Sequence, residues 1–197
     1  MGQSLPQAGI YLVQTLFNLY LMAVVLRFVL QLVRADFYNP VSQFLVKVTD
    51  PALKPLRRIV PGYGGIDIAS IVLALLVQAA GIYLIILISG VSLPNMFKPL
   101  LWSVVGFASL LLNIAFFAVI ITIILSWVAP QSRNPIVDLL RQITDPIMQP
   151  IQRLIPPIGG LDLSPIFVFI AINLLEILVV RNLAILFGVP RGIIMGL

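Results

Sequence analysis

Four long runs of almost uninterrupted apolar residues dominate the sequence, and shorter stretches with recurring polar residues separate them. The apolar runs lie near residues 10–33, 68–89, 103–128 and 163–182. About 20 helical residues are enough to cross the roughly 30 Å hydrocarbon core of a bilayer. The pattern therefore predicts an all-α membrane protein with four transmembrane helices.

Two of the polar stretches, each lying between two apolar runs, have similar sequences 95 positions apart. Residues 39–67 read NPVSQFLVKVTDPALKPLRRIVPGYGGID and residues 134–162 read NPIVDLLRQITDPIMQPIQRLIPPIGGLD, with twelve of the 29 positions identical. The match continues into the spans, where Asn18 pairs with Asn113. We predict a duplicated hairpin, with the first repeat at 1–94, a linker at 95–102 and the second repeat at 103–197. Two spans separate the motifs, so the repeats are parallel copies with both motifs on one membrane face.

Each motif predicts two short amphipathic helices lying in the membrane interface. Asn followed by Pro fits a first helix start, because Asn caps free amides and Pro needs no hydrogen bond there. Thr-Asp-Pro fits a second start with Asp as the cap, a Gly pair permits a sharp turn, and a final Asp caps the next span. The residues assigned to caps and turns are Asn39, Pro40, Thr49, Asp50, Pro51, Gly64, Gly65 and Asp67, and then Asn134, Pro135, Thr144, Asp145, Pro146, Gly159, Gly160 and Asp162.

The amino-acid composition limits the kinds of catalytic and metal-binding site that the chain can form. The chain is 60% apolar and 10% charged, and it contains neither Cys nor His. Disulfides, thiol nucleophiles, imidazole bases and the usual zinc ligands are thereby excluded. The carboxylates Asp50, Asp67, Asp145 and Asp162 fit helix caps; the alternative is that they form a cation or proton site at the cytoplasmic mouth. No nucleophile with a base is visible, so we expect no enzyme, no metal and no cofactor.

The net charge of +5 comes mainly from the motif segments, which hold eight of the twelve basic residues, whereas the linker holds only Lys98. The positive-inside rule then places both motifs in the cytoplasm and both termini outside. Between apolar runs, anionic lipid headgroups are the expected partner and nucleic acid is not. These residues either form a solvated face that sets orientation or bind lipids and partner proteins; the binding candidates are Lys47, Lys54, Arg57, Arg58, Arg141 and Arg153.

Polar residues inside the spans are a second candidate group, since such residues are costly in a bilayer. They are Asn18, Arg27, Gln78, Asn113, Asn173 and Glu176. In one interpretation the amides form hydrogen bonds between helices and hold the repeats together. In the other, a polar path at the pseudo-two-fold axis passes a cation or protons, with Glu176 as its charged station. A direct pair of Arg27 with Glu176 is not expected, because Arg27 lies nearer the cytoplasmic surface.

The doubled motif, TDPALKPLRRIVPGYGGID and TDPIMQPIQRLIPPIGGLD, each between two spans, resembles the YggT family of small bacterial membrane proteins and the related YlmG-like proteins of chloroplasts. The resemblance covers nearly the whole chain and implies the bacterial cytoplasmic (inner) membrane. It implies no agreed activity and no catalytic residues, but an association with osmotic stress, cell-division gene neighbourhoods and assembly of other membrane complexes. Gln149 and Gln152 replace Lys54 and Arg57 in the second copy, which would confine any role of the basic cluster to the first.

Two functions follow as hypotheses. The favoured one is a non-catalytic scaffold or assembly factor that presents basic amphipathic helices to membrane lipids and to other membrane proteins or further copies of itself. The alternative is a small cation or proton channel or transporter that aids osmotic adaptation through the intramembrane polar residues.

Overall fold

The computed structural model describes residues 4–90, 95–129, 132, 134–155 and 162–190, and every regular element in these ranges is a helix. Four helical stretches are long and apolar enough to cross a membrane. They are α1 (Ser4–Leu32), α3 (Ile68–Ser89), α4 (Lys98–Val128) and a continuous stretch made of α6 (Ser164–Leu175), the π-helical η1 (Glu176–Arg181) and α7 (Asn182–Leu186). The predicted fold class is confirmed. Two spans begin before the predicted residues, α1 at Ser4 and α4 at Lys98.

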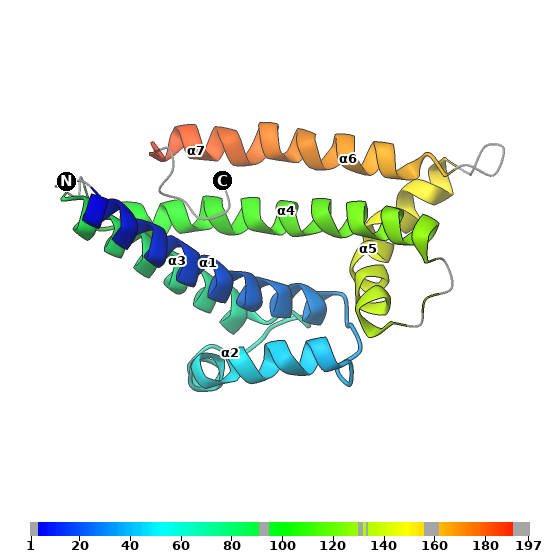
Figure 1. The fold of residues 1–197 in the computed structure, drawn as a ribbon, viewed down its shortest axis with the longest axis horizontal. Coiled ribbons are helices and arrows are strands. Elements are labelled where there is room, and N and C mark those ends of the chain that lie inside the picture. Colours follow the sequence, from blue (N-terminus) through cyan, green and yellow to red (C-terminus); the bar gives the residue numbers. More distant parts are fainter. Residues whose placement is uncertain (1–3, 91–94, 130–131, 133, 156–161, 191–197) are drawn as a thin grey trace.

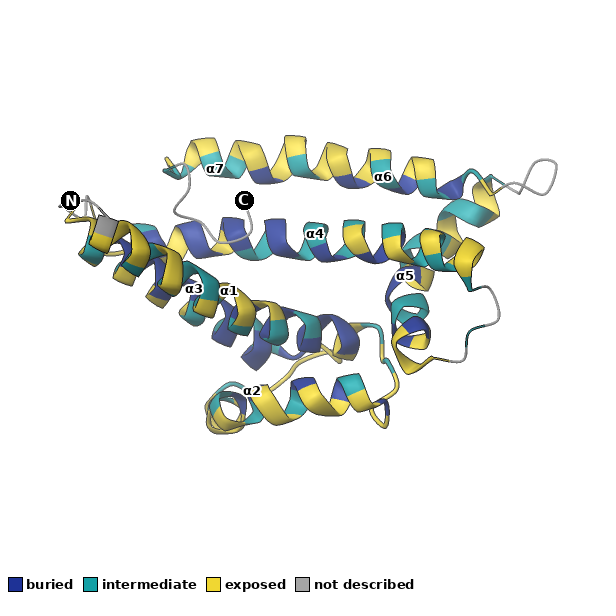
Figure 2. Ribbon diagram, in the orientation of Figure 1, coloured by how far each residue is buried: buried dark blue, intermediate teal, exposed yellow. Residues whose placement is uncertain are grey.

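The long helices pack side by side, and the two motifs lie together at one end of them (Figure 1). Within the first hairpin α1 packs along α3, and α3 then packs against α4, which contacts α6, η1 and α7. Among the described residues α6 has no contact with α1, so the repeats do not close into a ring. Figure 2 shows α6 exposed along most of its length, as expected for apolar residues that face lipid.

Each motif forms one amphipathic helix rather than the two predicted. The helices are α2 (Pro40–Ile59) and α5 (Pro135–Leu154), each of 20 residues. Thr49, Asp50 and Pro51 therefore lie in the middle of α2 and do not start a helix. Figure 1 shows that α2 changes direction along its length, as helices do at internal prolines.

Burial explains why the helix continues through its prolines. Ser42, Leu45, Thr49 and Leu53 follow one another at helical spacing and are all buried. This stripe spans both predicted halves of α2 and packs against α1 and α3 as one surface. Tertiary packing thus outweighs the local preference for a helix end before Pro51.

The second motif repeats this correction. Thr144 is buried, Asp145 is exposed, and Pro146 lies inside α5. Neither Asp50 nor Asp145 caps a helix. The buried threonines instead bond their own helix: Thr49 Oγ1 donates to Leu45 O at 2.6 Å and Thr144 Oγ1 donates to Leu140 O at 2.9 Å.

The predicted asparagine caps are confirmed. Asn39 Oδ1 accepts from Val41 N at 3.0 Å and Asn134 Oδ1 accepts from Ile136 N at 2.9 Å, with Pro40 and Pro135 as the first helical residues.

The carboxylates that precede the returning spans also accept from backbone amides. Asp67 is the N-cap of α3 and accepts from Ser70 N. Asp162 accepts from Ser164 N at 2.9 Å, but it lies one residue before Leu163, which occupies the N-cap position of α6, so its predicted cap position is wrong by one residue; Pro165 lies in the first turn.

The return from α2 to α3 depends on a glycine pair. Tyr63 and Ile66 exchange two backbone hydrogen bonds around Gly64 and Gly65, whose φ values are +61° and +83°. Left-handed backbone of this kind costs little only for glycine. The predicted sharp turn is confirmed for the first motif, while Gly159 and Gly160 lie outside the described residues.

We expect Gly65→Ala to lower the free energy of unfolding by about 1–2 kcal/mol, the cost of a left-handed L-residue. No heavy atom other than the glycine's own chain neighbours lies within 4 Å of an added Cβ, so the loss is purely conformational. Gly9→Ala is the control: its Cβ would lie 3.7 Å from an Ile88 methyl group, an ordinary contact. Because Ala is the better helix former by ~1 kcal/mol, this variant should not lose stability. Chemical denaturation in mixed micelles measures both, and equal losses would contradict the assignment.

Candidate functional site

The most densely charged part of the described structure lies where the end of α1 meets α2. Arg27, on α1, is only 8% exposed. Its Nη1 lies 2.7 Å from Asp50 Oδ1 and donates to Thr49 Oγ1 at 2.6 Å and to Val46 O at 3.2 Å. Lys54 Nζ lies 3.0 Å from the other carboxylate oxygen of Asp50. Asp50 is thus held between two cations.

Asp50 is the partner of Arg27 that sequence reasoning missed. The prediction assigned Asp50 as a helix cap, whereas Asp50 follows buried Thr49 inside a continuous helix. The available signal was the i, i+4 spacing of Asp50 and Lys54, which is typical of a helix interior. Burial opposes ionisation of Asp50, but hydrogen bonds from Lys54 and Arg27 outweigh it and lower the pKa of the carboxyl.

A second ion pair joins the end of α2 to the start of α3. Arg57 Nη2 donates to Asp67 Oδ2, and the same oxygen accepts from Ser70 Oγ at 2.6 Å. Burial raises the pKa of Asp67, but the hydrogen bonds from Arg57 and Ser70 outweigh it and leave the pKa below its usual value. Arg57, predicted to bind lipids or a partner protein, therefore also forms an ion pair that joins α2 to the start of α3.

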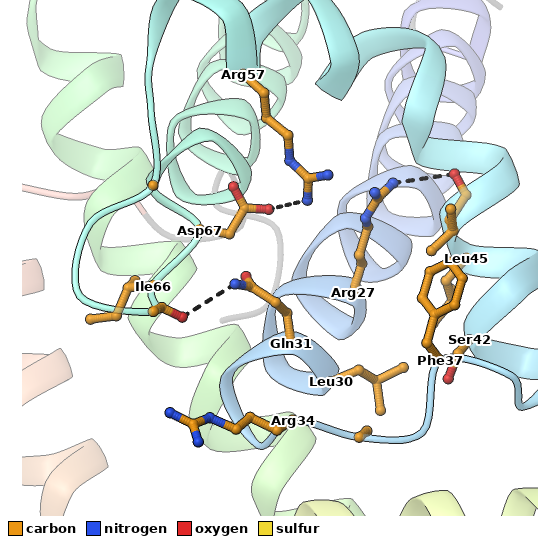
Figure 3. A pocket seen from close by; sticks show the side chains of 14 residues that line it. Arg27, Leu30, Gln31, Arg34, Phe37, Ser42, Leu45, Arg57, Ile66 and Asp67 are labelled. Atoms are coloured by element: carbon orange, nitrogen blue, oxygen red, sulfur yellow. Dashed lines mark hydrogen bonds and ion pairs between the residues drawn. The ribbon is translucent and has the colours of Figure 1, made fainter.

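Between these two pairs lies a cavity of about 820 Å³ (Figure 3). The polar residues that line it come from two helices and a turn: Arg27 and Gln31 lie on α1, Arg34 lies in the turn after α1, and Arg57 lies on α2. Gln31 Nε2 donates to Gly65 O at 3.2 Å, which ties α1 to the glycine turn. The remaining walls are Leu30, Ala35, Phe37, Ser42, Leu45, Val46, Gly62, Ile66 and Asp67.

The second repeat keeps the path of the chain and removes most of this charge. At the offset of 95, Thr122 stands at the position of Arg27, Gln149 at that of Lys54 and Gln152 at that of Arg57. Gln152 Nε2 donates to Asp162 Oδ2 at 2.9 Å, so the Arg57 and Asp67 contact has a neutral-to-charged counterpart. The pKa of Asp162 is also lowered, because bonds from Ser164 and Gln152 outweigh burial.

The predicted basic candidates divide into two groups. Lys47, Arg58 and Arg153 are exposed, and Arg141 is half-buried. Lys54 and Arg57 are exposed but hold Asp50 and Asp67.

The intramembrane amides do not come together in one place. Asn18 and Asn113 line a shared cavity of about 620 Å³ between α1 and α4. Gln78 is fully buried in α3, and Asn173 lies on an exposed part of α6, where its Nδ2 donates to Phe169 O of its own helix at 2.8 Å. The predicted bonding of all four amides between helices is therefore wrong for Asn173. Glu176 begins η1 and is half-buried.

The repeats are also joined directly at the motif end. Asn39 Nδ2 donates to Pro135 O at 2.7 Å, and Asp36 N donates to Gln142 Oε1 at 2.8 Å. The two motifs therefore form one surface. Among the described residues, no group of three or more acidic, Cys or His side chains could hold a metal ion.

The fold and this site define a polytopic membrane protein made of two hairpin repeats, each with a polar helix at the same end. The family model described as CCB3/YggT matches residues 6–88 and again residues 101–183. The chain belongs to the CCB3/YggT family.

The chain is similar to proteins from bacteria and from a plant. It is 54% identical over 188 residues to the uncharacterized protein PA0392 of Pseudomonas aeruginosa, covering 95% of each chain. It is 39% identical over 169 residues to the uncharacterized protein YggT of Escherichia coli strain K12, covering 84% of this chain and 86% of the relative. A match of 39% over 62 residues links it to YlmG homolog protein 2, chloroplastic, of Arabidopsis thaliana, covering 32% and 24%. No solved structure matches.

We expect Asp50→Asn to lower the free energy of unfolding by about 3 kcal/mol, because it leaves the buried Arg27 guanidinium without a counter-ion. The repeat offers the matched control, Asp145→Asn. Asp145 is exposed and Thr122 replaces the arginine, so this change should stay within about 0.5 kcal/mol. Denaturation of both variants in the same micelles gives the comparison. Similar losses would show that the ion pair does not account for the effect.

The lowered pKa of Asp67 makes stability depend on pH in one direction. Its contribution is fully present above the unfolded-state value near 4 and is lost as pH falls through the lower folded-state pKa. The stability difference between the parent and Asp67→Asn should therefore shrink as pH falls below about 4. Exposed Asp138→Asn serves as the control. A difference that grows on acidification would reverse the assigned sign.

Proposed function

We propose that this protein is a non-catalytic scaffold or assembly factor of the bacterial cytoplasmic membrane. The observation that carries this proposal is the pair of amphipathic helices α2 and α5, which lie at the same end of the spans, with hydrogen bonds from Asp36 and Asn39, just before α2, to α5. Such a surface suits attachment of other membrane proteins, or further copies of this chain, during assembly. Osmotic-stress tolerance and envelope or division processes are the settings in which we expect it to act.

The outer face of α2 combines apolar and basic side chains. Phe44 is 63% exposed and Ile59 is 79% exposed, close in sequence to exposed Lys47 and Arg58. A helix with apolar side chains on a basic surface binds at the boundary of headgroups and acyl chains. Its basic residues then contact anionic lipid or acidic groups on a partner. We place both motifs in the cytoplasm and both termini outside, following the excess of basic residues in the motifs.

The arrangement of the intramembrane amides supports a scaffold over a channel or transporter. Asn18 and Asn113 share a cavity, whereas Gln78 is buried elsewhere and Asn173 bonds its own helix. Asn18 and Asn113 thus line one cavity and Asn173 lines another, which does not amount to a continuous polar path. An ion pathway through a single copy would need such a path.

Partner capture tests the proposal. The triple variant Phe44→Ala, Lys47→Ala and Arg58→Ala removes exposed side chains that have no ion pair within the described structure, so the fold should persist. Because interface anchors often cost over 1 kcal/mol each, recovery of cross-linked partners from intact membranes should fall at least about tenfold. Growth after osmotic shock should fall in parallel.

Lys98→Ala, at the opposite end of the spans, is the control and should retain the same partners. If the triple variant captures the partners as well as the parent does, the scaffold surface is not on α2. Retained partners with lost osmotic growth would favour transport instead.

A further inference from the structure

We propose that the cavity enclosed by α1, α2 and the turn at residues 60–67 binds the phosphate-bearing headgroup of an anionic phospholipid. The inference deepens the proposed function, and it rests on that function only for the placement of α2 at the membrane surface. It names a specific lipid site that is separate from the exposed partner surface.

Charge is the first argument. Three arginines line the cavity, and two of them have carboxylate partners, Arg27 with Asp50 and Arg57 with Asp67. Arg34 is exposed and its side chain has no ion pair or hydrogen bond among the described residues. One cation is thus left for an anion, and guanidinium groups suit phosphate oxygens because they donate in pairs.

The end of α1 fixes the position of Arg34. Its φ is +55°, the one positive value at a non-glycine residue in the described chain, and it occupies the left-handed position just after a helix. Arg34 N donates to Gln31 O at 3.1 Å and Ala35 N donates to Leu30 O at 2.8 Å, the pair of hydrogen bonds that ends a helix in this way. The helix end therefore holds the backbone of Arg34 at the cavity.

A buried hydroxyl is the second, independent observation. Ser42 lines the same cavity, is 6% exposed, and its Oγ has no hydrogen-bond partner within the described structure. Native proteins rarely leave such a donor unpaired. The Oγ has almost no accessible surface, so rotation of the Ser42 side chain about χ1 would bring it to a phosphate oxygen in the cavity, while Arg34 supplies the charge.

Apolar walls distinguish a lipid from free phosphate. Leu30, Phe37, Leu45 and Ile66 line the cavity beside the arginines. Its volume of about 820 Å³ falls in the range of ligand pockets, roughly 300–1,000 Å³, and far exceeds the needs of a phosphate ion. The cavity also lies at the end of the first candidate span, Leu5–Leu32, which is the depth of headgroups.

The second repeat provides an internal comparison. The described residues of its motif line a small cavity of about 40 Å³. The six residues that line it, Thr122, Leu125, Ser126, Val137, Leu140 and Arg141, occupy the positions of Arg27, Leu30, Gln31, Ser42, Leu45 and Val46 at the offset of 95. The counterparts of Ala35, Gly62, Gly65 and Ile66 lie outside the described residues. Ala129 replaces Arg34 and Val137 replaces Ser42. The second copy therefore lacks the two residues assigned to the phosphate, and we expect one lipid per chain.

Lipid retention by the full-length protein in detergent tests the inference. Native mass spectrometry should detect one phosphatidylglycerol per chain. Phosphatidylcholine should bind at least about tenfold more weakly, because its choline cation cancels the net charge of the headgroup and is repelled by the arginines of the cavity. Arg34→Gln and Ser42→Ala should each weaken phosphatidylglycerol binding, and Arg34→Lys should restore part of it. Arg58→Gln is the matched control, because Arg58 is an exposed arginine of α2 that does not line the cavity.

Three outcomes would overturn the proposal: equal retention of phosphatidylcholine, equal effects of Arg34→Gln and Arg58→Gln, or displacement of the lipid by inorganic phosphate at comparable affinity. The last would assign the site to a free phosphate ion. Partner capture, measured with the Arg34→Gln variant, tests this inference separately from the scaffold function. If the triple surface variant loses its partners but still binds the lipid, the lipid site remains supported.

Discussion

The charged site of the first repeat depends on the burial of one guanidinium group. Arg27 sits near the end of a membrane span, where an unpaired cation would be costly, and it is accommodated because α2 brings Asp50 within 2.7 Å. That contact requires α2 to run as one helix across its prolines, so that Thr49 and Asp50 reach the end of α1. The same docking of α2 against α1 and α3 brings Arg57 to Asp67 and leaves the cavity between the two ion pairs.

Duplication shows which of these features the fold requires. Both copies keep Asn-Pro at the start of the polar helix, a buried threonine bonded to its own helix, and a carboxylate before the next span. Only the first copy has arginines at the positions of residues 27, 34 and 57. The shared features are local and set the chain path, whereas the arginines create a charged site on that path.

Local signals predicted most of the fold and little of the site. Apolar runs gave the four spans, and the Asn caps and glycine pair followed from backbone chemistry that a few neighbouring residues determine. The prediction of a helix start at Thr-Asp-Pro was wrong, because the same three residues fit both a helix start and the interior of a bent helix. Only the buried stripe from Ser42 to Leu53 decides between them. The pairing of Arg27 with Asp50 joins residues of different helices, so sequence spacing alone could not reveal it.

The neutral contact in the second copy bears on why the first copy is charged. Gln152 and Asp162 hold the end of α5 near the start of α6 with one hydrogen bond of 2.9 Å, so the returning chain does not need an arginine there. Replacing buried ion pairs by neutral groups often costs little or no stability. The arginines of the first copy are therefore poorly explained by stability alone. Their common position around an open cavity, one of them without a partner, is better explained by a bound anion.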